Sequence, residues 1–285
     1  MLGDMVGENS RKRKNQVRAV SQSHRPIYNI PRSEDEEPRR PKKAVTAKKL
    51  NEQKRRTARF REWRERRQIL REKPKLRGWL HLIAFPFSIA TSVILICLAP
   101  AGWMKVGISI YGASVMLLFG VSATLHLGHG YFPKLVDTVL CRIDYSNIFL
   151  VIAGTCTPFL FALNNKPICW TYMGLLWVTA AVGTVVHLLY PVGLDWLFTI
   201  IYCILGLSPL SIIYFFWTSP FIGPVPTILV ICGGACYIVG AVFFALRKPN
   251  PFPRWFGYHE LFHLGTIGGY VCHVIALFMV VLQMR

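Results

Sequence analysis

Seven long apolar runs constrain this chain more than any other feature of its sequence. Each run has about 20 residues or more, the length that an α-helix needs to cross the hydrocarbon core of a bilayer. Because backbone groups in lipid must be hydrogen-bonded within the protein, helices are the expected form. Short polar or Pro/Gly-rich breaks separate the runs, which cover residues 79–102, 103–128, 144–164, 168–190, 194–217, 225–246 and 260–284. The sequence therefore predicts an all-α membrane protein, a bundle of seven transmembrane helices.

The charged residues are concentrated in the N-terminal part of the chain. Residues 1–78 contain 25 of the 33 Lys and Arg and 10 of the 14 acidic residues, a net charge of +15. Residues 79–285 contain only 8 basic and 4 acidic residues, a net charge of +4. So few charges cannot cover the surface of a soluble protein. We therefore expect a basic cytoplasmic tail over residues 1–78 and a seven-helix transmembrane domain over residues 79–285.

The basic tail has two parts of different composition. Residues 1–46 are rich in Arg, Pro, Ser and blocks of like charge, a composition that predicts disorder. Residues 47–73 contain no Pro or Gly, so we expect a helix there. This helix could lie on anionic lipid headgroups, each basic residue contributing about 1 kcal/mol, or it could only fix the topology. Nothing beyond charge supports nucleic-acid binding, and we expect no nucleic-acid partner.

The distribution of Lys and Arg among the loops predicts the orientation. Cytoplasmic segments carry an excess of basic residues, which places the N-terminus in the cytoplasm. Seven crossings then put the C-terminus outside, the reverse of a G-protein-coupled receptor. No apolar segment typical of a cleavable signal peptide occurs in the first 78 residues. We expect a multi-pass protein of the plasma membrane, corresponding to the inner or cell membrane of a bacterium.

A few ionisable side chains occur inside the predicted spans, where each costs about 2.5–3.5 kcal/mol on insertion scales. The topology puts His126, Asp144, His259 and His263 at one cytoplasmic level of the membrane. His259 and His263 are spaced i, i+4, which brings both imidazoles to one helix face. With His126 they form a set of three histidines that leaves a position open for water, the pattern of a catalytic zinc site.

Other polar residues near this level have several interpretations. Ser122 lies one helical turn before His126, and Asp144 is expected to hold a water molecule or orient a ligand. Glu260 completes an H-E-x-x-H pattern, which makes an intramembrane metalloprotease a minor alternative. It could also support a metal ligand or face water at the start of a helix. The other histidines of residues 79–285 are expected to serve packing or to lie in a loop: His81, His187 and His273 for packing, and His129 in a loop.

The eight cysteines suggest no disulfide framework, because most lie within the predicted spans. Cys232 and Cys236 are one helical turn apart, which could indicate a thiolate pair. Their neighbours Gly233 and Gly234 favour a role in helix packing instead.

Several segments of the chain resemble a known family. These are Ser122–His126 (SATLH), Asp144–Tyr145, Ala153–Pro158 (AGTCTP), Tyr237–Ala245 (YIVGAVFFA) and His259–His263 (HELFH). Together they resemble the hemolysin III family, the bacterial branch of the progestin and adipoQ receptors, which is similar in site layout to alkaline ceramidases. The resemblance covers residues 77–285.

The resemblance implies that His126, His259 and His263 are zinc ligands. It also implies that Asp144 contacts the zinc through water and that Ser122 belongs to the polar site. Many relatives carry a Glu and an Asn ahead of the histidine in the first helix, whereas Arg77–His81 (RGWLH) retains only the histidine.

These observations lead to a functional hypothesis and two alternatives. The hypothesis is an intramembrane zinc-dependent hydrolase of a lipid amide or ester, similar to a ceramidase, with Asp144 accepting a proton and Ser122 stabilising the oxyanion. One alternative is a non-enzymatic cytolytic protein that forms a pore. The other is a lipid-sensing, receptor-like protein in which the zinc is structural. The sequence does not identify the substrate or the oligomeric state.

Overall fold

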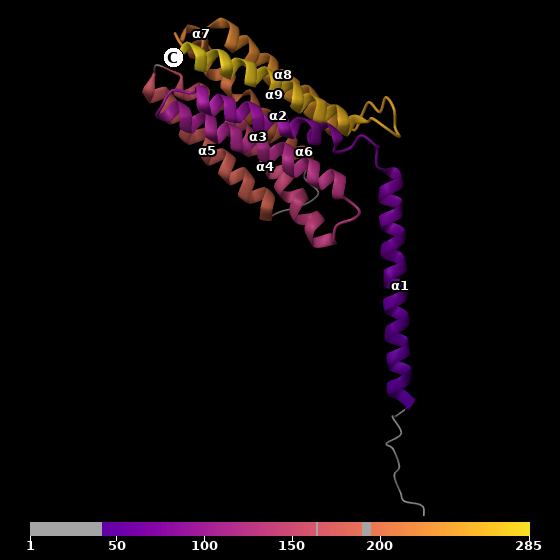
Figure 1. The fold of residues 1–285 in the computed structure, drawn as a ribbon. Coiled ribbons are helices and arrows are strands. Elements are labelled where there is room, and N and C mark those ends of the chain that lie inside the picture. The colour runs from indigo at the N-terminus through magenta and orange to yellow at the C-terminus, as the bar shows by residue number, and fades with distance from the viewer. Residues whose placement is uncertain (1–41, 164, 190–194) are drawn as a thin grey trace, which may run out of the picture. The chain divides into compact units, whose positions relative to one another are not determined.

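A computed structural model describes residues 42–163, 165–189 and 195–285 (Figure 1). In these ranges the regular structure is helical, apart from one isolated bridge between Phe252 and Phe256. The described residues fall into two compact units, one that ends at residue 55 and one that covers residues 56–285. The predicted all-α class is confirmed.

The first helix, α1, spans Lys42–Glu72. It begins five residues before the helix predicted over residues 47–73, so the disorder predicted for residues 1–46 is wrong for residues 42–46. Residues 1–41 of that prediction lie outside the described residues. Phe60 and Trp63 are exposed on α1 and stack on each other at 5.7 Å. The Arg64 and Arg67 guanidinium groups lie over these two rings. This exposed surface therefore combines aromatic and cationic groups.

Nine further helical segments follow α1 in the described residues. They are α2 (Trp79–Leu98), α3 (Trp103–Gly128), α4 (Lys134–Phe161), α5 (Lys166–Leu189), α6 (Asp195–Leu207), η1 (Ser208–Ile212), α7 (Ile213–Thr218), α8 (Pro224–Leu246) and α9 (Tyr258–Gln283). Among the described residues, six segments are long and apolar enough to cross a membrane: α2, α3, α5, residues 197–218, α8 and α9. The chain is thus a multi-pass membrane protein, while the count of seven crossings and the orientation remain predictions.

Two of the predicted spans differ in detail from the observed helices. Helix α4 begins at Lys134, ten residues before the predicted start at Asp144. Its first turns carry Lys134, Asp137 and Arg142, so an apolar pattern could not reveal them. The span predicted over residues 194–217 is divided into α6, η1 and α7, because Pro209 cannot donate a backbone hydrogen bond within a regular α-helix.

The helices of the second unit form a closed ring around an interior cavity. Helix α3 packs between α2 and α4, α4 also contacts α5 and α6, α6 contacts α8, and α9 joins α8 to α2. Figure 1 shows α8 and α9 side by side, with α2 next to α9. Large buried side chains fill the space between the helices, among them Tyr111, Phe119, Phe149, Phe159 and Phe216.

Glycines allow the closest helix contacts, and these contacts position the polar residues. A Cβ atom at Gly265 of α9 would lie 2.7 Å from the Cys236 carbonyl oxygen of α8. One at Gly240 of α8 would lie 3.1 Å from the Phe262 carbonyl oxygen. Such small residues let helix backbones touch in a membrane. The first turns of α9 are therefore held directly against α8.

Candidate metal centre

Three histidines from two helices converge at one end of the bundle. His126 lies in the last turn of α3, and His259 and His263 occupy the first two turns of α9. The Nε2 atoms of His126 and His259 are 3.1 Å apart. One ligand nitrogen from each of the three residues lies within 4.8 Å of the other two. The structure thus brings together the three histidines singled out in the sequence.

The separation of two of these imidazoles fits binding to one tetrahedral metal ion. Two nitrogens bound to one zinc ion at 2.0–2.1 Å would lie about 3.3 Å apart in a tetrahedral arrangement. The observed Nε2–Nε2 separation of 3.1 Å is close to that value. Two N–H groups at this separation would repel each other, so at least one nitrogen presents its lone pair to the centre. The three residues therefore form a donor set that could hold a metal ion.

A glycine at the start of α2 makes room for this arrangement. Gly78 adopts a left-handed conformation with φ of +88°, which disfavours any residue with a Cβ atom. A Cβ atom there would also lie 3.1 Å from the Cβ atom of His126. The start of α2 can therefore approach the end of α3 at the level of the histidines.

A carboxylate and a hydroxyl group lie beside the histidines. The Asp144 Oδ2 atom is 3.7 Å from the His126 Nε2 atom. The buried Ser122 hydroxyl interacts with the same carboxylate. Asp144 lies about three turns into α4 and not at its start. It still lies next to His126, as predicted, because the additional residues of α4 precede it in the helix.

Glu260 has a different environment from the one that a metalloprotease requires. Its side chain is 1% exposed, and its Oε1 atom accepts a hydrogen bond of 2.9 Å from the Arg77 Nε atom. Its Oε2 atom accepts a 2.8 Å hydrogen bond from the Gly257 backbone N–H and so caps the N-terminus of α9. Both oxygens are engaged away from the three imidazoles. This geometry disfavours Glu260 as a general base, and the idea that it faces water is wrong.

Sequence reasoning missed the role of Arg77, although its position just before the first apolar run was a signal. The segment that carries Arg77 is fixed to the loop before α9. The Lys75 and Leu76 backbone N–H groups donate to the carbonyl groups of Arg254 and Trp255, at 3.1 and 3.2 Å. Burial, followed by the Arg77 guanidinium, lowers the pKa of nearby Lys73. Arg77 thus connects the residues before α2 to the first turn of α9.

The other described histidines lie outside the three-histidine group. The buried His81 contacts the Thr266 hydroxyl at 2.9 Å through Nε2, and its ring centroid is 3.8 Å from that of His263. His129 follows α3 and forms an ion pair of 2.9 Å with Asp137. The packing and loop positions predicted for His81 and His129 are therefore confirmed, but the contact of His81 with a candidate ligand was not foreseen.

All eight cysteines are free, as the sequence suggested. Cys236 lies next to Gly268 of α9, with its Sγ atom 3.4 Å from the position of a Cβ atom there. In the described part of the chain, the only group of at least three potential metal ligands is the histidine group. The packing role predicted for Cys236 agrees with this environment, whereas Cys232 is exposed.

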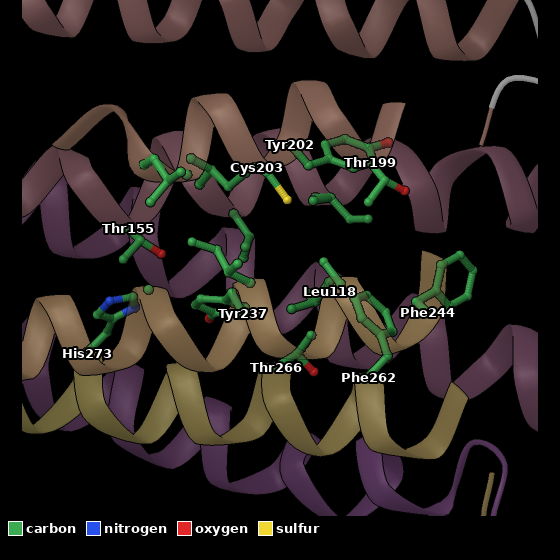
Figure 2. A pocket seen from close by; sticks show the side chains of 18 of the residues that line it. Leu118, Thr155, Thr199, Tyr202, Cys203, Tyr237, Phe244, Phe262, Thr266 and His273 are labelled. Carbon is green, nitrogen blue, oxygen red and sulfur yellow. The ribbon is translucent and has the colours of Figure 1, made fainter. Parts of the chain in front are cut away.

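A cavity of about 310 Å³ begins at the histidine group and extends into the bundle. Its wall includes Asp144 and His259 at one end and Thr155 and His273 at the other. Figure 2 shows Thr155 and His273 together at one end, and Phe244, whose ring contacts His259, at the other end. The rest of the lining is mainly apolar and includes Leu118, Val151, Ile152, Phe159, Ile213 and Ile238. The cavity can therefore take an elongated, mostly apolar ligand.

The fold and the site together define a class of protein: a multi-pass α-helical membrane protein with a histidine group at the end of an interior cavity. The family model described as Haemolysin-III related matches residues 70–274 of this chain. Because this match covers well over half of the sequence, the chain belongs to the haemolysin-III-related family.

Named relatives agree with this assignment. The chain is 32% identical to Hemolysin-3 of Bacillus cereus over 167 residues, which cover 58% of this chain and 70% of that protein. It is 30% identical to a Hemolysin-3 homolog of Bacillus subtilis (strain 168) over 192 residues, 66% of this chain and 85% of that protein. It is also 25% identical to Monocyte to macrophage differentiation factor of Homo sapiens over 201 residues, 70% of this chain and 80% of that protein. The resemblance found in the sequence is confirmed.

Proposed function

We propose that this protein is an intramembrane zinc-dependent hydrolase that cleaves an amide or ester bond of a membrane lipid. One observation carries this proposal: three imidazoles, a carboxylate and a hydroxyl group meet at the end of a long, mainly apolar cavity. An apolar chain fits such a cavity, and the polar end is where a carbonyl group would react. No other group of described residues combines these elements.

His126, His259 and His263 would hold the zinc ion through their ring nitrogens. When bound, zinc would polarise a carbonyl oxygen and make a water molecule more acidic. Asp144, 3.7 Å from His126, would accept a proton from the attacking water and return it to the leaving group. Ser122 interacts with this carboxylate and would orient it or donate a hydrogen bond to the developing oxyanion.

The proposal also specifies the class of substrate and the membrane in which the protein acts. A membrane lipid of ceramide-like chemistry would enter from the bilayer, with its amide or ester at the histidine group. The basic tail would bind anionic lipid headgroups at the cytoplasmic face of a plasma membrane. This would fit the predicted cytoplasmic N-terminus.

Metal analysis and a lipid assay on the purified full chain test the proposal. We expect about one zinc ion per chain and hydrolysis of at least one amide or ester in a panel of ceramides, acyl-amino lipids and glycerolipids. His126→Ala should lose both the zinc and the activity. Full zinc content together with full activity in this variant would rule the proposal out.

The name of the relative Hemolysin-3 supports a second candidate, lysis of membranes. A pore would need polar residues along its whole length, whereas the lining of this cavity is mainly apolar. Dye release from liposomes that is unaffected by a chelator, with no lipid hydrolysis, would favour lysis. Zinc retention without turnover, combined with a loss of thermal stability on chelation, would favour a receptor-like protein with structural zinc.

A further inference from the structure

The end of the cavity remote from the candidate metal centre has two buried polar side chains. We propose that Thr155 and His273 form a subsite for a hydroxyl group in the middle of an otherwise apolar ligand chain. This inference rests on the proposed function, since it takes the histidine group as the place where the carbonyl end of the lipid binds.

His273 presents an unused hydrogen-bond acceptor. Its side chain is 5% exposed, and its Nε2 atom is 3.3 Å from the Val230 carbonyl oxygen of α8. A carbonyl oxygen only accepts, so Nε2 carries the proton and Nδ1 carries the lone pair. In the described part of the chain, this buried Nδ1 atom has no partner. The ring is also held by Tyr237, on which it stacks at 5.7 Å.

Thr155 presents an unused hydroxyl group. Threonine in a helix usually donates to the carbonyl four residues earlier, and Thr157 does so to Ala153 at 2.8 Å. Thr124, Thr138, Thr179 and Thr218 form the same type of bond. The Thr155 hydroxyl is buried, and it has no partner among the described residues. This difference from the neighbouring Thr157 makes Thr155 available to a ligand.

The two unused groups select a hydroxyl group as their partner. A hydroxyl can donate to the His273 Nδ1 atom and accept from the Thr155 hydroxyl at the same time. A ketone oxygen could not donate, and an ionised group would lose its hydration in this buried, mainly apolar cavity. Thr155 and His273 come from α4 and α9 and line the same end of the cavity (Figure 2).

The position of this subsite defines where the hydroxyl lies on the chain. His273 follows His263 by ten residues of α9, an axial distance of about 15 Å. Three single bonds of an extended chain cover about 3.6 Å, so about twelve bonds cover this distance. A fatty acyl chain with a hydroxyl group near its twelfth carbon would match both the histidine group and the subsite.

Binding of fatty acids to the purified full chain tests the inference without requiring turnover. The probes are stearic acid, 12-hydroxystearic acid and 2-hydroxystearic acid, measured by calorimetry in detergent. We expect 12-hydroxystearic acid to bind about three- to tenfold more tightly than stearic acid, because its hydroxyl group forms hydrogen bonds with the subsite. The 2-hydroxy isomer should show no such gain, because its hydroxyl would lie at the other end of the cavity.

Two variants and a matched control complete the test. Thr155→Val keeps the shape of the side chain and removes only an unpaired hydroxyl, so it should fold normally and abolish the preference while leaving stearic acid affinity unchanged. His273→Phe should do the same. Thr199→Val changes another threonine of the cavity wall, shown away from His273 in Figure 2, and should retain the preference.

Several results would overturn the inference. They are equal affinity for the 12-hydroxy and unsubstituted acids, no binding of either acid, or a preference that survives Thr155→Val. Occupation of the subsite by water alone would produce the first of these results. The proposed hydrolase activity is tested separately by the loss of zinc and turnover in His126→Ala, so either idea can fail without the other.

Discussion

The two ends of the cavity both contain buried or partly buried histidines, but the nitrogen atoms of these histidines face different partners. At the metal end, the Nε2 atoms of His126 and His259 face each other at 3.1 Å. At the far end, the Nε2 atom of His273 faces the Val230 carbonyl oxygen. An Nε2 atom that faces a carbonyl is satisfied by the protein, whereas Nε2 atoms that face one another favour a cation between them. The partner of each Nε2 atom thus distinguishes a candidate metal ligand from a histidine that is anchored to the protein and leaves only its Nδ1 atom without a partner among the described residues.

The largest effect is expected from removing a histidine at each end in turn. His263→Ala should lose the bound zinc, because each ligand contributes about 3 kcal/mol, more than 100-fold in affinity. His273→Phe should keep the metal content of the unmodified protein. Metal analysis of both purified variants checks this, and equal metal loss in the two would remove the distinction between the ends.

The next largest effect is expected from a substitution that should lower turnover without removing the bound zinc. Asp144→Asn should retain zinc, since it leaves all three imidazoles in place, but lower turnover by about 100- to 10,000-fold because the proton acceptor is lost. Asp137→Asn is the matched control, as its carboxylate pairs with His129 outside the histidine group. Turnover rates and zinc content of the two variants provide the measurement. Unchanged turnover in Asp144→Asn would exclude Asp144 as the base.

A smaller effect is expected from the ion pair that supports the metal end. Arg77→Met should lower the free energy of unfolding by about 2–3 kcal/mol, because the buried Glu260 carboxylate loses its charged partner. The loss is smaller than for a fully buried ion pair, since the Arg77 side chain is partly exposed. Glu260 also caps the helix that carries His259 and His263, so zinc affinity should fall about 10- to 100-fold. Thermal unfolding and zinc titration measure both changes.

Two comparisons make the Arg77 prediction specific. Lys75→Met removes a neighbouring positive charge that lies over the Trp255 ring, and it should have little effect on zinc affinity. Arg77→Met combined with Glu260→Gln should recover part of the stability, because the buried charge is then gone. If the double variant is as unstable as the sum of the two single variants, the ion pair is not the cause.

The apolar runs were a good guide to the fold because lipid-facing helices must be apolar over their whole length. The boundaries of α3 match the prediction over residues 103–128. The start of α4 was missed because its first turns are polar, and the break in the sixth span depends on Pro209 in a segment that is otherwise apolar. An apolar composition identifies the helical residues that lie in lipid. It does not show where a helix continues outside the lipid with polar residues.

The candidate site was partly predictable for a related reason. A topology prediction puts helix ends on a common level, which was enough to bring His126, Asp144 and the α9 histidines together. The pairing of Arg77 with Glu260 joins residues 183 positions apart, and neither residue type indicates it. The availability of Thr155 depends on which way its hydroxyl points. Such details depend on rotamers and packing, which residue types alone do not specify.

The smallest effect is expected at the far end, where two adjacent glycines of α8 provide a matched pair. A Cβ atom at Gly233 would lie 2.6 Å from the His273 Nε2 atom, whereas one at Gly234 would meet nothing within 4 Å. Gly233→Ala should therefore displace the His273 ring and destabilise the protein by about 1–3 kcal/mol, the range for overpacking a core. Gly234→Ala should change stability by no more than about 1 kcal/mol, and in the favourable direction, because alanine is the better helix former. Thermal unfolding compares the two, and zinc content should be unchanged in both because neither substitution reaches the three metal-end histidines. Loss of zinc in Gly233→Ala alone would mean that the two ends of the cavity are mechanically coupled through α9.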